Sequence, residues 1–200
     1  MDTDRTETNP RSLETKPDAT GAGAKDSGDG GGVLPEPWLR GTLGEVPAVA
    51  RAVLHALELA GEDVRRWAGP LSEAQMKMRP AGLPAVAFQM RHIGRSADRL
   101  LTYAEGGALT AEQLTALKAE NDENASLAEL FGEFDETIAR SMMRVRALAR
   151  EDLEQPRYVG KKRLPSSLGG LLVHVAEHTQ RHVGQLITTA KVVAAIRKSE

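Results

Sequence analysis

The 200-residue chain contains no cysteine. This absence excludes disulfides, thiolate metal sites and cysteine nucleophiles, and it fits a cytoplasmic protein. No run of about 18 apolar residues is present to span a membrane, and the polar N-terminus lacks the apolar core of a signal peptide. The sequence also shows neither a basic face nor an aromatic platform for stacking bases. We therefore expect a cytoplasmic protein that binds neither a membrane nor nucleic acid.

The charges of the chain nearly balance, with 26 basic and 28 acidic residues, so nothing in the overall charge favours a polyanionic partner. Its apolar content of 40% is sufficient for one hydrophobic core. The first 36 residues differ from the rest, because they hold eight acidic residues, six glycines and no aromatic residue. Such a segment buries too little apolar surface to offset the entropy of ordering. We expect residues 1–36 to be a disordered tail and residues 38–200 to be one folded domain.

The apolar residues recur with helical spacing and almost nowhere alternate with the period of two typical of a strand. Short helices are expected to begin at Ser72, the first residue of a capping box, and near Thr110. Pro84 is expected in the first turn of the second long helix, and Ser166 is expected to cap the fourth long helix. The segment through Pro156 is expected to be a loop. The long helices are predicted over residues 46–67, 83–104, 126–150 and 166–196.

These elements predict an all-α four-helix bundle with short connecting helices. The connection between the second and third long helices is long enough to be a crossover. Simple up-and-down topology therefore does not follow from the pattern.

The stretch HVAEHTQRH, residues 174–182, holds three of the five histidines of the chain. Its first half, His174 to His178, has the H-x-x-E-H pattern of an inverted zinc peptidase helix, in which the glutamate is the general base. At 100° per residue, however, Glu177 lies roughly 160° from the core direction of the helix. Its carboxylate is expected to face solvent, and too little chain follows to supply a later ligand. We therefore reject the peptidase interpretation.

His178 and His182 are one turn apart on the same helix face, so two imidazoles can converge on one metal ion. A third ligand is needed, and His92 lies at the edge of the apolar arc of the second long helix, where it can face a neighbouring helix. His55 has no partner nearby in the sequence. A lone helical histidine is more often an ordinary core or boundary residue. A non-catalytic bundle that binds a protein partner and keeps remnant histidines is therefore the alternative interpretation.

Three segments of the chain resemble the DinB/YfiT-like superfamily of metal-binding four-helix bundles. Residues 71–80, LSEAQMKMRP, resemble a connector of that family. Residues 90–94, MRHIG, resemble its second-helix ligand motif, and residues 175–185, VAEHTQRHVGQ, resemble its H-x-x-x-H-R-G-Q motif. Val183 departs from the last motif, because many members have arginine there.

The resemblance implies a divalent metal, zinc or nickel, held by His92, His178 and His182. Three neutral histidines leave a coordination position open, which is typical of catalytic sites and lets the metal activate a thiol or a water. Members of the family include thiol-dependent S-transferases. The resemblance therefore implies a metal-dependent transferase or hydrolase with a small-molecule substrate, in which a low-molecular-weight thiol can be the cofactor. The resemblance also implies that the protein can form a homodimer.

No separate catalytic acid or base is identified in the sequence. Residues near the expected ligands can support them from behind, or they can be ordinary helix surface. These candidates are Gln89, Arg91, Asp98 and Gln185. The basic run Lys161-Lys162-Arg163, just before the fourth long helix, can attract an anionic molecule or can simply be solvated.

Overall fold

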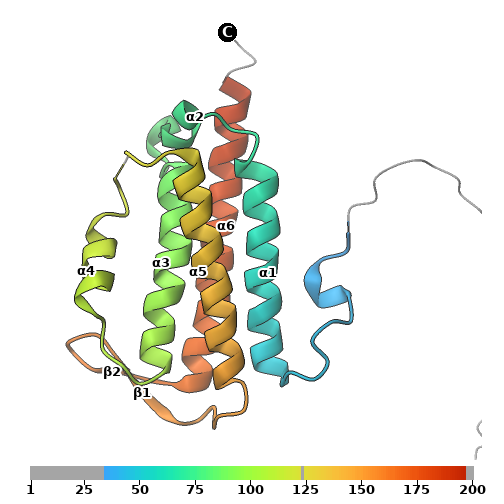
Figure 1. Cartoon of the computed structure of the whole chain (residues 1–200), viewed down its shortest axis with the longest axis vertical. Coiled ribbons are helices and arrows are strands. Elements are labelled where there is room, and N and C mark those ends of the chain that lie inside the picture. Colours follow the sequence, from blue (N-terminus) through green and yellow to red (C-terminus); the bar gives the residue numbers. More distant parts are fainter. Residues whose placement is uncertain (1–33, 123, 197–200) are drawn as a thin grey trace, which may run out of the picture. The chain divides into compact units, whose positions relative to one another are not determined.

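The computed structural model describes residues 34–122 and 124–196, so most of the expected N-terminal tail and the last four residues lie outside the described part. Four long helices form the bundle and confirm the all-α prediction (Figure 1). They are α1 (Ala48–Ala68), α3 (Val86–Ala104), α5 (Leu127–Leu148) and α6 (Leu168–Ile196). The shorter elements are η1 (Pro37–Leu39), α2 (Glu73–Lys77), η2 (Pro80–Gly82), α4 (Ala111–Lys118), β1 (Pro156–Val159) and β2 (Leu164–Ser167).

The bundle has a closed ring of neighbours, in which α6 packs against α1 and α3, and α5 also packs against both. Figure 1 shows that α1 and α6 run in one direction while α3 and α5 run in the other. Because α3 and α5 are parallel neighbours, the chain must travel back along the bundle before α5 begins, over about 28 Å for a helix of this length. The connection that carries α4 does this. The predicted crossover is therefore confirmed.

Three helix starts follow directly from the sequence. Ser72, Thr110 and Ser126 each begin a helix with a full capping box, in which the side chain accepts the backbone N–H of the third helical residue. The predicted position of Pro84 in the first turn of a helix is wrong, because α3 begins only at Val86. The carbonyl of Pro84 instead accepts a hydrogen bond from Thr189 Oγ1 on α6, at 3.2 Å.

The loop expected through Pro156 contains an antiparallel hairpin, which the sequence did not predict. Val159 pairs with Leu164 across a four-residue turn, and each strand has only four residues. No residue of either strand is buried: exposed and half-buried residues alternate in β1, whereas β2 has two exposed residues followed by two half-buried ones. Strands this short and this exposed do not show the apolar period of two in the sequence. Ser166 lies within β2, and it is Ser167 whose Oγ accepts the backbone N–H of Gly170 at the start of α6, at 3.1 Å. The predicted cap is thus displaced by one residue.

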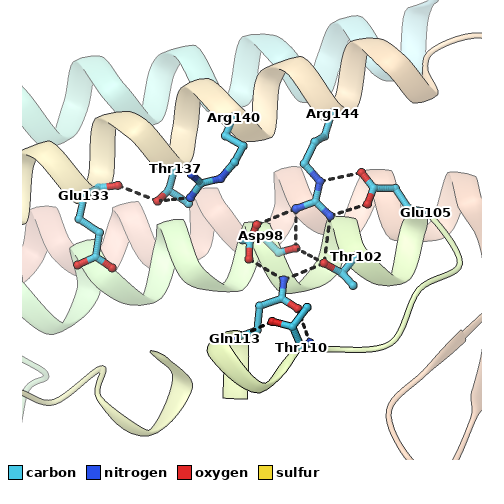
Figure 2. A network of polar contacts seen from close by, with 9 residues as sticks. All are labelled: Asp98, Thr102, Glu105, Thr110, Gln113, Glu133, Thr137, Arg140 and Arg144. Atoms are coloured by element: carbon cyan, nitrogen blue, oxygen red, sulfur yellow. Dashed lines mark hydrogen bonds and ion pairs between the residues drawn. The ribbon is translucent and has the colours of Figure 1, made fainter. Parts of the chain in front are cut away.

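Helix α4 is attached to the bundle mainly by polar contacts, since none of its residues is buried. Figure 2 shows the centre of this network, where Arg144 of α5 reaches Asp98 and Glu105, each at 2.7 Å. Gln113 of α4 donates to Asp98 at 2.6 Å and to Thr102 at 2.8 Å. Burial alone would lower the pKa of Arg144, but the two carboxylates raise it above its ordinary value. The crossover therefore depends on hydrogen bonds and ion pairs for its position.

The hydrophobic core of the bundle is largely aliphatic, as the low aromatic content requires. Phe134 of α5 is buried among residues such as Leu57, Met90 and Leu186 from the other three long helices. No helix within the described residues combines the length and the apolar character needed to cross a membrane.

Candidate metal centre

The three histidines predicted to bind metal come together where α3 faces α6. His92 lies on α3, and His178 and His182 lie one turn apart on α6. The ring centroid of His92 is 4.2 Å from that of His182 and 5.2 Å from that of His178, and the two α6 rings are 4.5 Å apart. The packing of α3 against α6 thus joins residues that are 86 positions apart in the sequence.

One nitrogen from each ring can point into the same small space. These three nitrogens all lie within 4.8 Å of one another, and the Nε2 atoms of His92 and His178 are 3.1 Å apart. Three nitrogens around one tetrahedral zinc at 2.0 to 2.1 Å are about 3.3 Å apart, so the cluster is close to ligand spacing. No other group of three or more potential ligand side chains in the described part of the chain gathers this closely.

The ring of His92 is oriented by a buried carboxylate. Its Nδ1 lies 2.8 Å from Oε2 of Glu120, whose other oxygen accepts a hydrogen bond from Arg99 at 2.7 Å. Burial alone would raise the pKa of Glu120, but the hydrogen bonds from His92 and Arg99 outweigh it and hold that pKa below its ordinary value. An ionised carboxylate can only accept, so Nδ1 of His92 carries a proton, and in the neutral ring Nε2 is then the nitrogen with a lone pair for a metal.

The ring of His182 is oriented in the same way by an amide. Its Nδ1 lies 2.8 Å from Oε1 of Gln89, and the amide nitrogen of Gln89 donates to Oε1 of Gln185 at 3.0 Å. Gln89 is fully buried, so its side chain is held in place. Because Oε1 is an acceptor, His182 also carries its proton on Nδ1 and keeps Nε2 available as a ligand.

His178 and His182 are held in the neutral form. Burial, together with repulsion from neighbouring histidines, lowers the pKa of each to about 4, because a charged imidazole is disfavoured both by desolvation and by other charged imidazoles. A histidine must be neutral to bind a metal ion. The electrostatic environment of α6 at this point therefore favours the ligand form of both rings near neutral pH.

His174, Glu177 and His55 do not belong to the cluster of three histidines. The side chains of His174 and Glu177 are 41% and 54% exposed, and Glu177 forms an ion pair with Arg181. The rejection of the H-x-x-E-H interpretation is therefore consistent with the structure. His55 is buried on α1, where its Nε2 contacts Thr42 Oγ1 at 3.1 Å.

The supporting residues suggested by sequence proximity divide into two groups. Gln89 contacts His182 directly, and Gln185 holds Gln89. Arg91 instead donates to the backbone carbonyl of Asp122, and Asp98 belongs to the Arg144 network of Figure 2. Two of the four residues that are close to the expected ligands in the sequence, Gln89 and Gln185, are therefore connected to the cluster by hydrogen bonds.

Glu120 was missed at the sequence level. It lies in a polar run of the crossover, Glu120-Asn121-Asp122-Glu123-Asn124, which reads as a solvated connection, yet the Glu120 side chain is only 6% exposed. Phe88, one turn before His92, was also missed, and its ring stacks on His92 with centroids 5.5 Å apart. Only the folded path of the crossover places a carboxylate here, and no periodicity in the sequence signals it.

The chemistry of this donor set fits a divalent metal ion. Three neutral imidazoles suit ions such as zinc, nickel or copper, whereas magnesium and calcium prefer oxygen ligands. All three rings are partly exposed, so a small molecule or water can approach the same nitrogens from solvent. The His92, His178 and His182 cluster could therefore hold a metal ion with a coordination position left open.

The same part of the chain matches a known family. The sequence model of the DinB superfamily matches residues 56–186, which is more than half of the chain and includes all three clustered histidines. No curated protein matches the chain significantly. With the helical bundle described above, this match shows that the chain belongs to the DinB superfamily.

Proposed function

We propose that the protein is a metal-dependent enzyme in which His92, His178 and His182 bind one divalent ion, zinc or nickel. The observation that carries this proposal is the convergence of three imidazole nitrogens, with Glu120 and Gln89 orienting two of the rings from behind. A bound divalent metal lowers the pKa of a coordinated water or thiol and polarises carbonyl groups. Three protein ligands leave room for such a molecule, as in catalytic zinc sites.

A transferase or hydrolase reaction suits this arrangement best. The chain contains no cysteine, so a thiol at this site must belong to a small-molecule cofactor or substrate. The protein's own residues would hold the three nitrogens in place and keep His178 and His182 neutral. Among residues 34–122 and 124–196, Glu120 is the carboxylate in contact with the cluster, and it is already engaged by His92 and Arg99, so we assign no general base.

A cavity of about 340 Å³, lined by none of the three histidines but in part by residues near His182 on α6, offers space for part of a substrate. It is lined by Arg181, Gln185 and Thr188 of α6 and by Leu83 and Pro84 of the segment before α3. Gln185 connects this cavity to the cluster through Gln89. We propose that part of a small-molecule substrate binds here.

Metal analysis of the untagged protein tests the metal site. We expect about one equivalent of zinc or nickel in the wild type after growth with both metals. The double variant His178→Ala/His182→Ala should lose it, while His174→Ala, which changes an exposed histidine of the same helix, should keep it. Metal that persists at the same stoichiometry in the double variant would contradict the proposal.

A thermal-shift screen separates the enzyme from a protein-binding module. A molecule that binds only the folded state raises the melting temperature by mass action. We expect divalent metals to stabilise the metal-free protein, and low-molecular-weight thiols to stabilise the metal-loaded protein further. If neither metals nor thiols shift the wild type, the histidines are remnants, and the interpretation as a non-catalytic bundle is correct.

A further inference from the structure

A separate cavity of about 410 Å³ lies between the β1–β2 hairpin and the segment that joins α3 to α4. We call it the hairpin cavity. It is far from the three clustered histidines. The hairpin ends where α6 begins, at Leu168, and His178 lies ten residues further along α6, or about 15 Å at the rise of an α-helix. Its volume is within the range of small-molecule sites. The proposed metal-dependent reaction does not require it.

Part of the lining of the hairpin cavity is apolar and aromatic. Tyr103 lies in the last turn of α3, Leu109 and Leu114 come from the crossover, and Tyr158 comes from β1. Tyr158 and Leu114 are 45% and 42% exposed, although both are large apolar side chains. Two aromatic rings and two leucines around one opening form a surface suited to a flat apolar molecule.

The charged residues of the lining are all basic, and they are Arg157, Lys161 and Arg163. The guanidinium of Arg157 is already occupied by the carbonyl of Ala104 and by Gln155. Arg163 instead lies over the ring of Tyr158, 4.3 Å from its centroid, and no hydrogen bond from its side chain is found within the described residues. In the same part of the chain, the ammonium of Lys161 has no acidic partner. Two cations at the cavity are thus available to an anion.

The hairpin turn that carries these cations contains a residue with an unfavourable backbone conformation. Arg163 has φ +48°, in the left-handed region that non-glycine residues rarely adopt, and Gly160 at the other end of the turn has φ +69°. The bent turn places Arg163 over the ring of Tyr158. Strained backbone of this kind is enriched at ligand sites.

We propose that the hairpin cavity binds a small organic anion, with its acidic group at Lys161 and Arg163 and its flat apolar body between the two tyrosines. The cavity is too small and has too few cations for a polyanion such as nucleic acid. The basic run of the sequence therefore serves as a ligand site in part, since Lys161 and Arg163 line the cavity while Lys162 between them does not.

Isothermal titration calorimetry with 1-naphthoate tests the proposal on the full chain. We expect saturable binding with a dissociation constant on the order of 1 mM or lower, which is typical of a ligand of this size. Acetate has the carboxylate but not the naphthalene ring, and 1-naphthalenemethanol has the naphthalene ring but no charge. Both should bind at least tenfold more weakly. Equal affinity for naphthoate and the uncharged alcohol would overturn the proposal, as would the absence of saturable naphthoate binding.

Two neighbouring lysines provide a matched pair of variants. Lys161→Gln should weaken naphthoate binding about tenfold, because it removes a charged hydrogen-bond donor at the cavity. Lys162→Gln makes the same change in the same turn and should leave binding within twofold of the wild type. If both variants lost the same naphthoate affinity, the binding would reflect general attraction by the basic run. That result would contradict a site in the hairpin cavity.

A third variant separates this site from the metal centre. His178→Ala/His182→Ala should bind naphthoate as the wild type does, whether or not the wild type holds metal. If naphthoate binding disappears with the histidines, the anion is at the metal centre, and the assignment to the hairpin cavity is wrong.

Discussion

Nδ1 of His92 lies 2.8 Å from Oε2 of Glu120. This contact joins α3 to the crossover, 28 residues further along the chain. Arg99, two turns after His92 on α3, holds the other oxygen of the same carboxylate. The crossover therefore supports the histidine cluster in addition to connecting α3 with α5. Any change that moves residue 120 should alter the metal affinity without touching a ligand.

Replacement of Glu120 by alanine should weaken zinc binding by about 10- to 100-fold, because loss of the carboxylate behind a ligating histidine frees its ring and its tautomer. Glu120→Gln keeps an acceptor and should lose less. Zinc competition against a chromophoric chelator measures both variants. As a control, Glu136→Ala removes an exposed acidic residue of α5 and should bind zinc as the wild type does. An unchanged affinity in Glu120→Ala would show that this contact does not support the site.

The sequence predicted the parts of the site that depend on local periodicity. His178 and His182 share a helix face because of their spacing, and the capping box at Ser126 started α5 where expected. Glu120 could not be predicted in this way, because its position depends on the path of a connection with no repeating pattern. The hairpin was not predicted for a related reason, since a strand such as Pro156–Val159 has only four residues, none of them buried, and is too short to show a clear apolar period.

Arg144 should contribute more to stability than a surface arginine on the same helix. Arg144→Met removes ion pairs with Asp98 and Glu105 from a partly buried network (Figure 2), and we expect a loss of about 1 to 2 kcal/mol in the free energy of unfolding. Arg146→Met removes only a distant contact with Glu45, at 3.9 Å, and should change stability by less than about 0.5 kcal/mol. Urea unfolding measures both, and similar losses would argue against a special role for the network.

Gly94 should be required by close helix packing, whereas Gly132 should be replaceable. A Cβ atom on Gly94 of α3 would lie 3.2 Å from Cβ of Thr137 on α5, and Thr137 is buried. Gly94→Ala should therefore destabilise the protein by about 1 kcal/mol, even though alanine is the better helix former. A Cβ on Gly132 would meet nothing within 4 Å.

Gly132→Ala should consequently stabilise the protein by roughly 0.5 to 1 kcal/mol through helix propensity alone. Thermal unfolding of the two variants under identical conditions gives the comparison. A gain in stability from Gly94→Ala would mean that α3 and α5 can separate at this point more easily than their packing indicates.

Acid should selectively weaken the attachment of the segment after η1 to α1. Arg40 binds Glu62 through two hydrogen bonds of 2.6 and 2.8 Å, and these hydrogen bonds hold the pKa of Glu62 below its ordinary value. A carboxylate with a lowered pKa in the folded state contributes stability above its unfolded pKa, near 4.5, and loses that contribution as the pH falls through its folded pKa. Glu62 is 44% exposed, so the contribution at neutral pH should be only about 0.5 to 1 kcal/mol.

Glu62→Gln should therefore be less stable than the wild type at pH 7, and this difference should shrink as the pH falls below about 4.5, where the wild-type carboxylate is protonated as well. Urea midpoints at several pH values measure the difference directly. Glu45→Gln changes a carboxylate that is 71% exposed and should follow the wild type at every pH. A constant difference between Glu62→Gln and the wild type down to pH 3 would show that the variant acts through packing and not through the charge of the Arg40 pair.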